Sequence, residues 1–430
     1  MENTNKAHFL SSKTVVIAGA GVAGLSLAIA LAQQFPLEDV QTQRPRILVY
    51  ERDSEADRIA GRQGYSLSLR TDSDPGGIQV LERLGLYKRI RSVSVNAHDS
   101  EADRGCFNIW DQDFNPVLRI HGRPVGPKGL LGMRVGRGAL QCELAAAAVE
   151  AGAEIHWSTA VIGVKPLLGT GTTPPVGQVE ISLSDGAAVV ADLLIAADGS
   201  SSKIRSLLLP SHGLDYTGIY LWGGTGVFAE RTQIPRPVDR DWGAVLGGQG
   251  IGLFVSPIDS TSALWSMSRA SPTPQPSLRH PLTQDQIDAM IDESIQLSAR
   301  FHPLVRDLVQ VSDPSSLIQL NAMDRPPFAH DVGALGPVVW IGDANHAVSP
   351  FAGNGANMAL MDAWDLAECL KCAATLQDAI VAYDARVLPR GNGVLKASRW
   401  TIDISHASGW KFWLYRYALW VVSLFVRVPV

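Results

Sequence analysis

Cysteine is scarce in this chain, which has four in 430 residues. So few cysteines suit a reducing compartment and cannot build a disulfide scaffold, so we expect an intracellular, cytoplasmic protein. Cys369 and Cys372 form a C-x-x-C pair, but it lies several turns inside an expected helix, away from the N-terminal end where a helix lowers a thiol pKa. Because Cys106 and Cys142 are isolated, we expect core cysteines and no metal site.

The chain also lacks concentrated runs of basic residues, and its formal net charge is −5. Both features argue against a nucleic-acid partner. The first residues lack the charged start and continuous apolar segment of a signal peptide. Residues 14–37 carry no charge, yet Gly19, Gly21 and Gly24 interrupt them, so we expect no membrane span there.

Long hydrophobic runs are missing at the C-terminal end too, where the uncharged run 417–426 is ten residues long. A helix that crosses a bilayer needs roughly 20 apolar residues. Aromatic and apolar residues nevertheless recur here at helical spacing, at Trp410, Trp413, Tyr417, Trp420 and Leu424. We expect this apolar face to pack on the protein itself, and peripheral membrane contact stays open as the alternative.

What is present is a globular composition, with 46% hydrophobic and 18% charged residues. The length favours two interlocked lobes. Residues 14–18 form an apolar, β-branched run, followed by Gly19, Gly21, Ala23 and Gly24 and then by a helical pattern. This order predicts a strand, a tight turn that admits a pyrophosphate, and a helix packed closely on the strand.

A second apolar strand, residues 47–50, ends in Glu51 and Arg52. Glu51 follows Gly24 by 27 residues, somewhat more than the usual spacing of about 20, and the insert 37–46 accounts for the excess. An acid at this strand end accepts hydrogen bonds from an adenosine ribose, so the unit predicts dinucleotide binding.

The segment 338–357 offers a second corner of the same kind. Asp343 stands just beyond a short buried strand, at the end of the sheet where ligands bind in open α/β folds. A glycine-rich turn and an apolar helix follow, and a helix N-terminus favours a partly negative ligand. The expected cofactor-binding residues here are Asp343, Pro350, Gly353, Gly355, Ala356 and Asn357.

Three further positions complete the expected cofactor site. Asp198 follows a buried strand, residues 193–196, and makes a further acidic strand end. Arg137 opens a helix, where the dipole disfavours its charge, so a phosphate is one expected partner and solvent the alternative. Gly64 permits a close approach of the backbone just before an alternating strand.

Residues 105–120 and 214–270 are rich in strand patterns and predict a substrate lobe. Neither GGTG nor GGQGIG in the latter segment precedes a helical pattern, so no second dinucleotide fold is expected, which disfavours a two-domain reductase. The expected segments are dinucleotide-binding parts at 1–70, 131–213 and 319–388, substrate-lobe parts at 71–130 and 214–318, and an aromatic-rich helix at 389–430.

The motifs GAGVAGLSLA with ERD, DGSSSKIR and GDANHAVSPFAGNGAN occur in this order between residues 15 and 388. In this respect the chain resembles the FAD-dependent aromatic-ring hydroxylases, single-component flavoprotein monooxygenases, and is most similar to the tetracycline-inactivating ones. The resemblance implies an α/β, Rossmann-like FAD-binding fold of the para-hydroxybenzoate hydroxylase type. It also implies an interleaved mixed β-sheet substrate lobe and C-terminal helices.

The resemblance also implies roles for particular residues. The three glycines of the first motif would hold the pyrophosphate, Glu51 the adenosine ribose and Asp343 the ribityl chain. Arg137 would touch FAD, Asp198 and Arg205 belong to a motif associated with FAD and the nicotinamide donor, and residues 355–357 would lie under the pyrimidine edge of the flavin. Three positions depart from the family pattern, because Asn345 replaces a usual alanine, Ser349 a proline and Asn354 a glutamine.

The implied activity is that of an FAD-dependent monooxygenase that uses NADPH or NADH and O₂. A flavin C4a-hydroperoxide would insert one oxygen atom into a hydrophobic, aromatic or polycyclic small molecule of secondary-metabolite type. Arg205 and Tyr220 are candidate catalytic residues, with a structural arginine and a core tyrosine as alternatives. Epoxidation, Baeyer–Villiger insertion or dehydrogenation on the same fold stays open, as do a flavin-binding protein without turnover and the oligomeric state.

Overall fold

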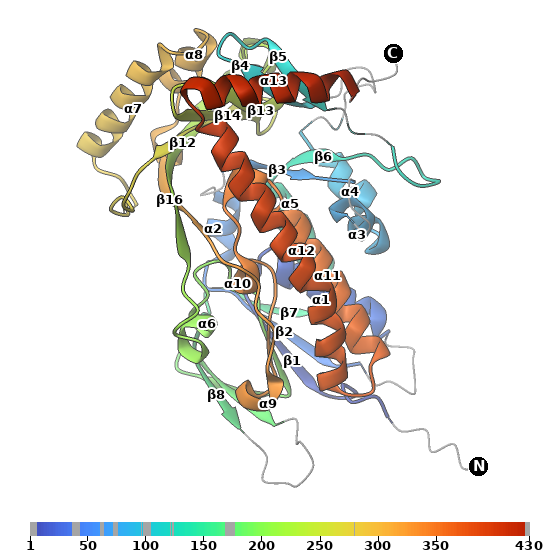
Figure 1. Ribbon diagram of the computed structural model, residues 1–430. Helices are drawn as coiled ribbons and strands as arrows, with labels where there is room; N and C mark the ends of the chain where they lie inside the picture. The colour runs from blue at the N-terminus through green and yellow to red at the C-terminus, as the bar shows by residue number, and fades with distance from the viewer. Residues whose placement is uncertain are drawn as a thin grey trace.

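The computed structural model describes residues 7–36, 44–60, 64–71, 76–95, 97, 105–120, 122, 124–167, 177–278 and 280–425. Within them the chain forms an α/β fold in two lobes joined by a long helix (Figure 1). The lower lobe of the figure is built on a parallel five-stranded sheet. Its strand order is β17 (Val338–Trp340), β11 (Leu193–Ala196), β1 (Thr14–Ala18), β2 (Arg46–Tyr50) and β7 (Glu154–His156).

The apolar strands of this sheet are buried on both faces, as expected for a covered parallel sheet. Alternate residues face opposite sides, so Val15 and Ile17 pack in one core cluster and Val16 and Ala18 in another. The first face is covered by α1 (Val22–Gln34), α5 (Arg137–Glu150) and α11 (Gly355–Cys372). The second is covered by an antiparallel sheet of β8 (Val161–Leu167), β9 (Gln178–Leu183) and β10 (Ala188–Ala191).

The upper lobe is a mixed seven-stranded sheet. Its strand order is β16 (Ile318–Asp324), β12 (Asp215–Val227), β15 (Ser262–Ala270), β14 (Ile251–Pro257), β13 (Trp242–Leu246), β4 (Phe107–Asp111) and β5 (Pro116–Ile120). Helices α7 (Gln284–Ser298) and α8 (Leu304–Gln310) pack on one face of this sheet. Because β16 pairs with β12, residues 318–324 belong to this sheet, and the expectation that residue 319 returns to the cofactor lobe is wrong.

Between the two lobes lies a two-stranded sheet of β3 (Ser66–Leu69) and β6 (Met133–Gly136). Next to it come α3 (Gly77–Arg83) and α4 (Tyr87–Ser92), whose apolar residues Ile78, Leu81 and Ile90 join the core of the lower lobe. The expectation that segment 71–130 belongs wholly to the substrate lobe is therefore wrong. The helical pattern predicts an apolar face, but it does not show which lobe covers that face. The short helices elsewhere are α2 (Glu55–Ala60), α6 (Lys203–Leu208), α9 (Val332–Leu335) and α10 (Asp343–His346).

The C-terminal part is two helices rather than one. The long α12 (Leu376–Ser405) runs from the lower lobe to the upper one, and α13 (Gly409–Phe425) lies across β4 and β5 (Figure 1). Only one side of α13 packs on the sheet, through Phe412, Tyr415 and Leu419.

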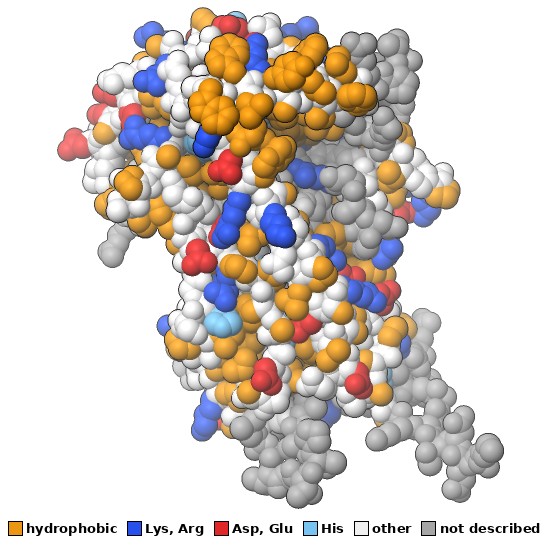
Figure 2. Space-filling view, viewed as in Figure 1, with side chains coloured by type: hydrophobic (Ala, Val, Ile, Leu, Met, Phe, Trp, Pro, Cys, Tyr) orange, Lys and Arg blue, Asp and Glu red, His pale blue; other side chains and the backbone are white. Residues whose placement is uncertain are grey.

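The expected apolar face of α13 points outward instead. Trp410 is 72% exposed, Trp413 65% and Tyr417 63%. Figure 2 shows hydrophobic side chains gathered over this helix at the top of the molecule. The expectation that this face packs on the protein is wrong, since helical spacing shows that residues share a face but not what covers that face. No helix among the described residues is both long and apolar enough to cross a membrane.

Candidate functional site

The turn after β1 needs glycine at two positions, for different reasons. Gly19 has φ +107°, which side chains other than glycine rarely adopt, and a Cβ there would overlap the carbonyl of Ala197. A Cβ on Gly24 would overlap the carbonyl of Gly19, so this glycine allows α1 to pack on the turn. Gly21 has nothing within 4 Å of its Cβ position and lies in a cavity wall with Ala23. The turn therefore presents bare backbone to the cavity.

Glu51 closes this turn from the next strand. Its Oε2 accepts a hydrogen bond from the backbone N–H of Ala20 at 2.7 Å, and its Oε1 accepts one from that of Asp53 at 3.0 Å. A carboxylate has further acceptor positions, so Glu51 can also accept from a ribose. Arg52 points away, with its side chain 75% exposed and near Asp53, and it is not among the residues that line the cavity.

Asp343 stands on the cavity wall, where its side chain is exposed to the open space. Its pKa is raised by its position deep in the protein, although the charges of His346, Arg137 and Arg205 oppose that shift. Arg137 also lines the cavity, with its guanidinium 5.8 Å from the ring centre of Tyr65. The carboxylate and the arginine thus face the same space.

The turn before α11 opens the start of that helix to the cavity. Pro350 begins a 3₁₀ turn, and Gly353 ends it in the left-handed conformation, with φ +56°. Asn354 makes no side-chain hydrogen bond that caps α11, so its side chain leaves the first N–H groups of this helix available. Residues 350–356 all line the cavity. Such an N-terminus suits the electron-rich edge of a ring.

Two other expected positions hold the framework. The side chain of Asn357 accepts a hydrogen bond from the backbone N–H of Arg70 at 2.9 Å and donates one to the carbonyl of Ser68 at 2.8 Å. Asn357 therefore ties α11 to β3, and it is only 1% exposed. Gly64 leaves room for Thr225, whose hydroxyl donates to the Gly64 carbonyl at 3.0 Å.

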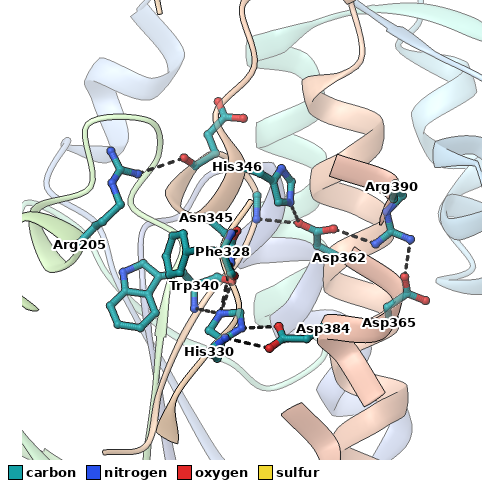
Figure 3. A network of polar contacts seen from close by, with 12 residues as sticks. Arg205, Phe328, His330, Trp340, Asn345, His346, Asp362, Asp365, Asp384 and Arg390 are labelled. Carbon is teal, nitrogen blue, oxygen red and sulfur yellow. Dashed lines mark hydrogen bonds and ion pairs between the residues drawn. The ribbon is translucent and has the colours of Figure 1, made fainter. Parts of the chain in front are cut away.

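A buried charge network lies behind the Asp343 loop (Figure 3). His346 Nε2 is 2.6 Å from Asp362 Oδ2, which also accepts the backbone N–H of Gly342 at 2.8 Å. Arg390 of α12 donates to Asp362 at 2.9 Å and to Asp365 at 2.7 Å. Burial lowers the pKa of His346, but the Asp362 carboxylate outweighs it and the pKa is raised. Likewise, burial raises the pKa of Asp362, but His346 and Arg390 outweigh it and the pKa is lowered.

Two of the positions that depart from the family pattern lie behind this loop. Asn345 is fully buried, accepts the backbone N–H of Phe328 at 3.1 Å and donates to its carbonyl at 3.0 Å (Figure 3). The Ser349 hydroxyl lies 2.7 Å from that of Ser398 on α12. Asn345 thus fastens the irregular segment between β16 and α9, and Ser349 joins the loop to the long helix.

Asp198 and Arg205 occupy the third acidic corner without facing the cavity. Asp198 Oδ2 accepts the backbone N–H of Ile204 at 3.2 Å, Oδ1 is buried without a partner, and burial raises the pKa of this carboxyl. Arg205 is 3% exposed, and its guanidinium donates to backbone carbonyls, among them that of Ala344 at 2.8 Å (Figure 3). This geometry matches the structural alternative for Arg205, which holds the Asp343 loop from behind.

Tyr220 lies on the other face of the sheet. It stacks on Trp222 at 5.1 Å between ring centres and packs in the core under α7 and α8. Its neighbour Leu221 points to the cavity instead, because side chains alternate along a strand. The geometry matches the core-tyrosine alternative.

The cavity has a volume of about 2350 Å³ and lies between the two lobes. Small-ligand sites occupy roughly 300–1,000 Å³, so this space is large enough for a dinucleotide and a second molecule. Its upper wall is mostly apolar, and its residues include Phe107, Ile109, Leu221, Trp242, Leu246, Phe254, Leu264 and Leu320. The charged residues Asp343, Arg70, Arg134 and Arg137 also contribute to the lining.

Sequence reasoning missed the His346–Asp362–Arg390 network and the buried Arg134. His346 stands within the third motif, and Asp362 follows it by 16 residues on an apolar helix, so an acid amid apolar residues was the available signal. Arg134 stands in the short strand before Arg137 and carried no motif. Such pairings depend on contacts between distant segments.

A parallel sheet whose glycine turn is closed by an acidic second strand end, with a helix N-terminus facing the same cavity as that turn, is typical of a dinucleotide-binding fold. Similarity to known proteins then identifies the family. The model of the FAD binding domain family matches residues 12–398, so the chain belongs to this family. It is also 35% identical over 416 residues to the monooxygenase cfoF of Aspergillus candidus, with 94% of each chain covered. The protein is therefore an FAD-dependent monooxygenase, and the expected resemblance is confirmed.

Solved structures share the fold at lower identity. The Klebsiella pneumoniae HpxO complex with FAD and uric acid has a TM-score of 0.72 and 18% identity, with 96% of this chain and 94% of that one covered. The tetracycline destructase Tet(51) has a TM-score of 0.61 and 16% identity, with 97% and 99% covered. These similarities confirm the expected fold class with its mixed sheets and C-terminal helices.

Proposed function

We propose that this monooxygenase takes electrons from NADPH or NADH and inserts one atom of O₂ into a hydrophobic, aromatic or polycyclic molecule. One observation carries the proposal: the same cavity has a lower wall of bare backbone with Asp343 and an upper wall formed by the apolar face of a sheet. Bound FAD would supply the redox chemistry, because no amino-acid side chain activates O₂.

The chain's own residues would bind, orient and exclude water. Gly19, Gly21 and Gly24 would admit the pyrophosphate and Asp343 would accept from sugar hydroxyls. The start of α11 would stabilise negative charge on the ring. The apolar upper wall would keep water from the reacting atoms. We assign no catalytic side chain, since the geometry of Arg205 and Tyr220 fits structural roles.

The test is purification, an absorbance spectrum, and NADPH and NADH consumption against a panel of phenols, polyketides and alkaloids. We expect a yellow protein whose NADPH or NADH consumption rises with a true substrate, and a product heavier by one oxygen atom. A product that has lost hydrogens instead would identify a dehydrogenase. A protein that stays colourless in excess FAD would overturn the proposal.

The role of Asp343 has its own test. Asp343→Ala should lose flavin during gel filtration, whereas Asp378→Ala, which changes a carboxylate at the exposed start of α12, should retain it. Full flavin retention by Asp343→Ala would remove the assigned role while leaving the rest of the site intact.

A further inference from the structure

Arg134 is a buried cation in the wall of the cavity. It lies on β6 opposite Ser68 of β3, and it is 6% exposed. Its guanidinium sits 5.4 Å from the ring centre of Trp242 and 5.9 Å from that of Phe254, two rings of the upper sheet. Arg134, Trp242 and Phe254 all line the cavity. The cation therefore stands where the cofactor wall meets the apolar wall.

The charge of Arg134 has no acidic partner among the described residues. Its guanidinium donates to the Ser68 hydroxyl at 2.8 Å and to the Ser66 carbonyl at 2.8 Å, while its buried Nε has no hydrogen-bond partner. Burial lowers the pKa of Arg134 to about 9, and the like charge of Arg70 adds to that shift. The group still carries its charge at neutral pH, and an unpaired buried charge is costly.

Joining the two sheets does not require this charge. The Ser66 hydroxyl accepts a hydrogen bond from the Arg134 guanidinium at 2.5 Å and lies 3.1 Å from the Ser256 hydroxyl. It donates its own proton to the Pro257 carbonyl at 2.7 Å, a neutral hydrogen bond that does not involve the arginine. These contacts already connect β3 to β14. A neutral side chain at position 134 would fill the same space without the desolvation cost, so the positive charge calls for an anion that arrives with a ligand.

We propose that Arg134 holds an ionised oxygen of the substrate, so that the substrate class is an apolar or aromatic molecule with a carboxylate, phenolate or enolate. The rings of Trp242 and Phe254 offer apolar surface beside the cation, and a bound oxyanion would neutralise the charge in the cavity. That the bound molecule is the substrate rests on the proposed function. The anion site itself does not, because it is inferred from the contacts of Arg134.

The experiment titrates the FAD-bound protein with naphthoate and with naphthamide, which share shape and differ in charge. Binding is followed by the change in flavin absorbance and by equilibrium dialysis. We expect naphthoate to bind about tenfold or more tightly than naphthamide, as a charge-assisted hydrogen bond would give. Arg134→Gln should abolish this preference by weakening naphthoate alone.

A matched control is Arg83→Gln. The Arg83 guanidinium also lies 5.4 Å from a ring centre, that of Trp364, but Arg83 is exposed and does not line the cavity. The Arg83→Gln variant should keep the preference for naphthoate over naphthamide. Arg134→Lys, which keeps the charge, should retain part of it and serves as the variant should Arg134→Gln fail to fold.

Three outcomes would overturn the proposal. The first is equal binding of naphthoate and naphthamide by the unaltered protein, which needs no variant. The second is a preference that survives in Arg134→Gln. The third is an altered flavin reduction potential in Arg134→Gln with an unchanged preference, which would assign the cation to the flavin. Should no oxygenated product ever form while Arg134→Gln still abolishes the preference, the proposed function fails and the anion site stands.

Discussion

The two walls of the cavity are held in place by different interactions. The cofactor wall consists of turns whose backbone is packed against other backbone, as at Gly19 and Gly24, and of a loop fastened from behind by buried charges. The substrate wall is the face of a mixed sheet, made of side chains such as Leu221 and Leu264 that end in the open space. A change at a packed position of the first wall disturbs the framework, whereas a change in the second wall alters mainly the surface that a ligand meets.

The largest effect should come from Asp362→Asn, which leaves His346 buried without its carboxylate and leaves Arg390 with Asp365 as its remaining acidic partner. Removing one partner of a buried ion pair costs about 3–5 kcal/mol. We expect a loss of this order in the free energy of unfolding, measured by urea titration, together with weaker FAD retention, because Asp362 also holds Gly342 beside Asp343. Glu154→Gln, in an exposed ion pair with Arg46, should change little.

This loss should depend on pH. The lowered pKa of Asp362 contributes stability above the ordinary carboxyl value, and it is lost as pH falls through the lowered value. The raised pKa of His346 contributes stability below the ordinary histidine value, and it is lost as pH rises through the raised value. The gap between the unaltered protein and Asp362→Asn should therefore be widest between these two limits. A gap that stays constant from acidic to alkaline pH would contradict the pairing.

Gly24→Ala and Gly21→Ala separate packing from ligand contact within the cofactor wall. The added Cβ meets the Gly19 carbonyl in the first variant and open space in the second. Overpacking costs about 1–3 kcal/mol, so Gly24→Ala should lower the free energy of unfolding by that amount, even without FAD. Gly21→Ala should unfold like the unaltered apoprotein and bind FAD more weakly, as fluorescence titration would measure. Equal stability of the two apoprotein variants would contradict this division.

The same division explains what the sequence could predict. The glycine turn, Glu51 and Asp343 could be predicted as site residues because each follows directly from local order along the chain: strand, turn, helix. Asn357 was found as a site residue, but its side chain holds β3, because helical position does not reveal which distant strand lies beside it. The outward face of α13 and the side of β12 on which Tyr220 lies depend on which surface another element covers. The local sequence pattern does not determine which surface is covered.

The smallest effect should come from the substrate wall. Leu320 is 50% exposed on β16 and lines the cavity. Leu320→Ala removes apolar surface that the rest of the protein scarcely covers, so thermal stability and flavin content should stay unchanged. A ligand that buries this side chain would lose about 0.8 kcal/mol for each methylene contact, so its dissociation constant should rise a few-fold. Leu207→Ala is the matched control, since Leu207 is 41% exposed on α6 and does not line the cavity. Equal ligand affinity in the two variants would show that the ligand does not reach β16 and would confine it to the side of the cavity near Trp242 and Phe254.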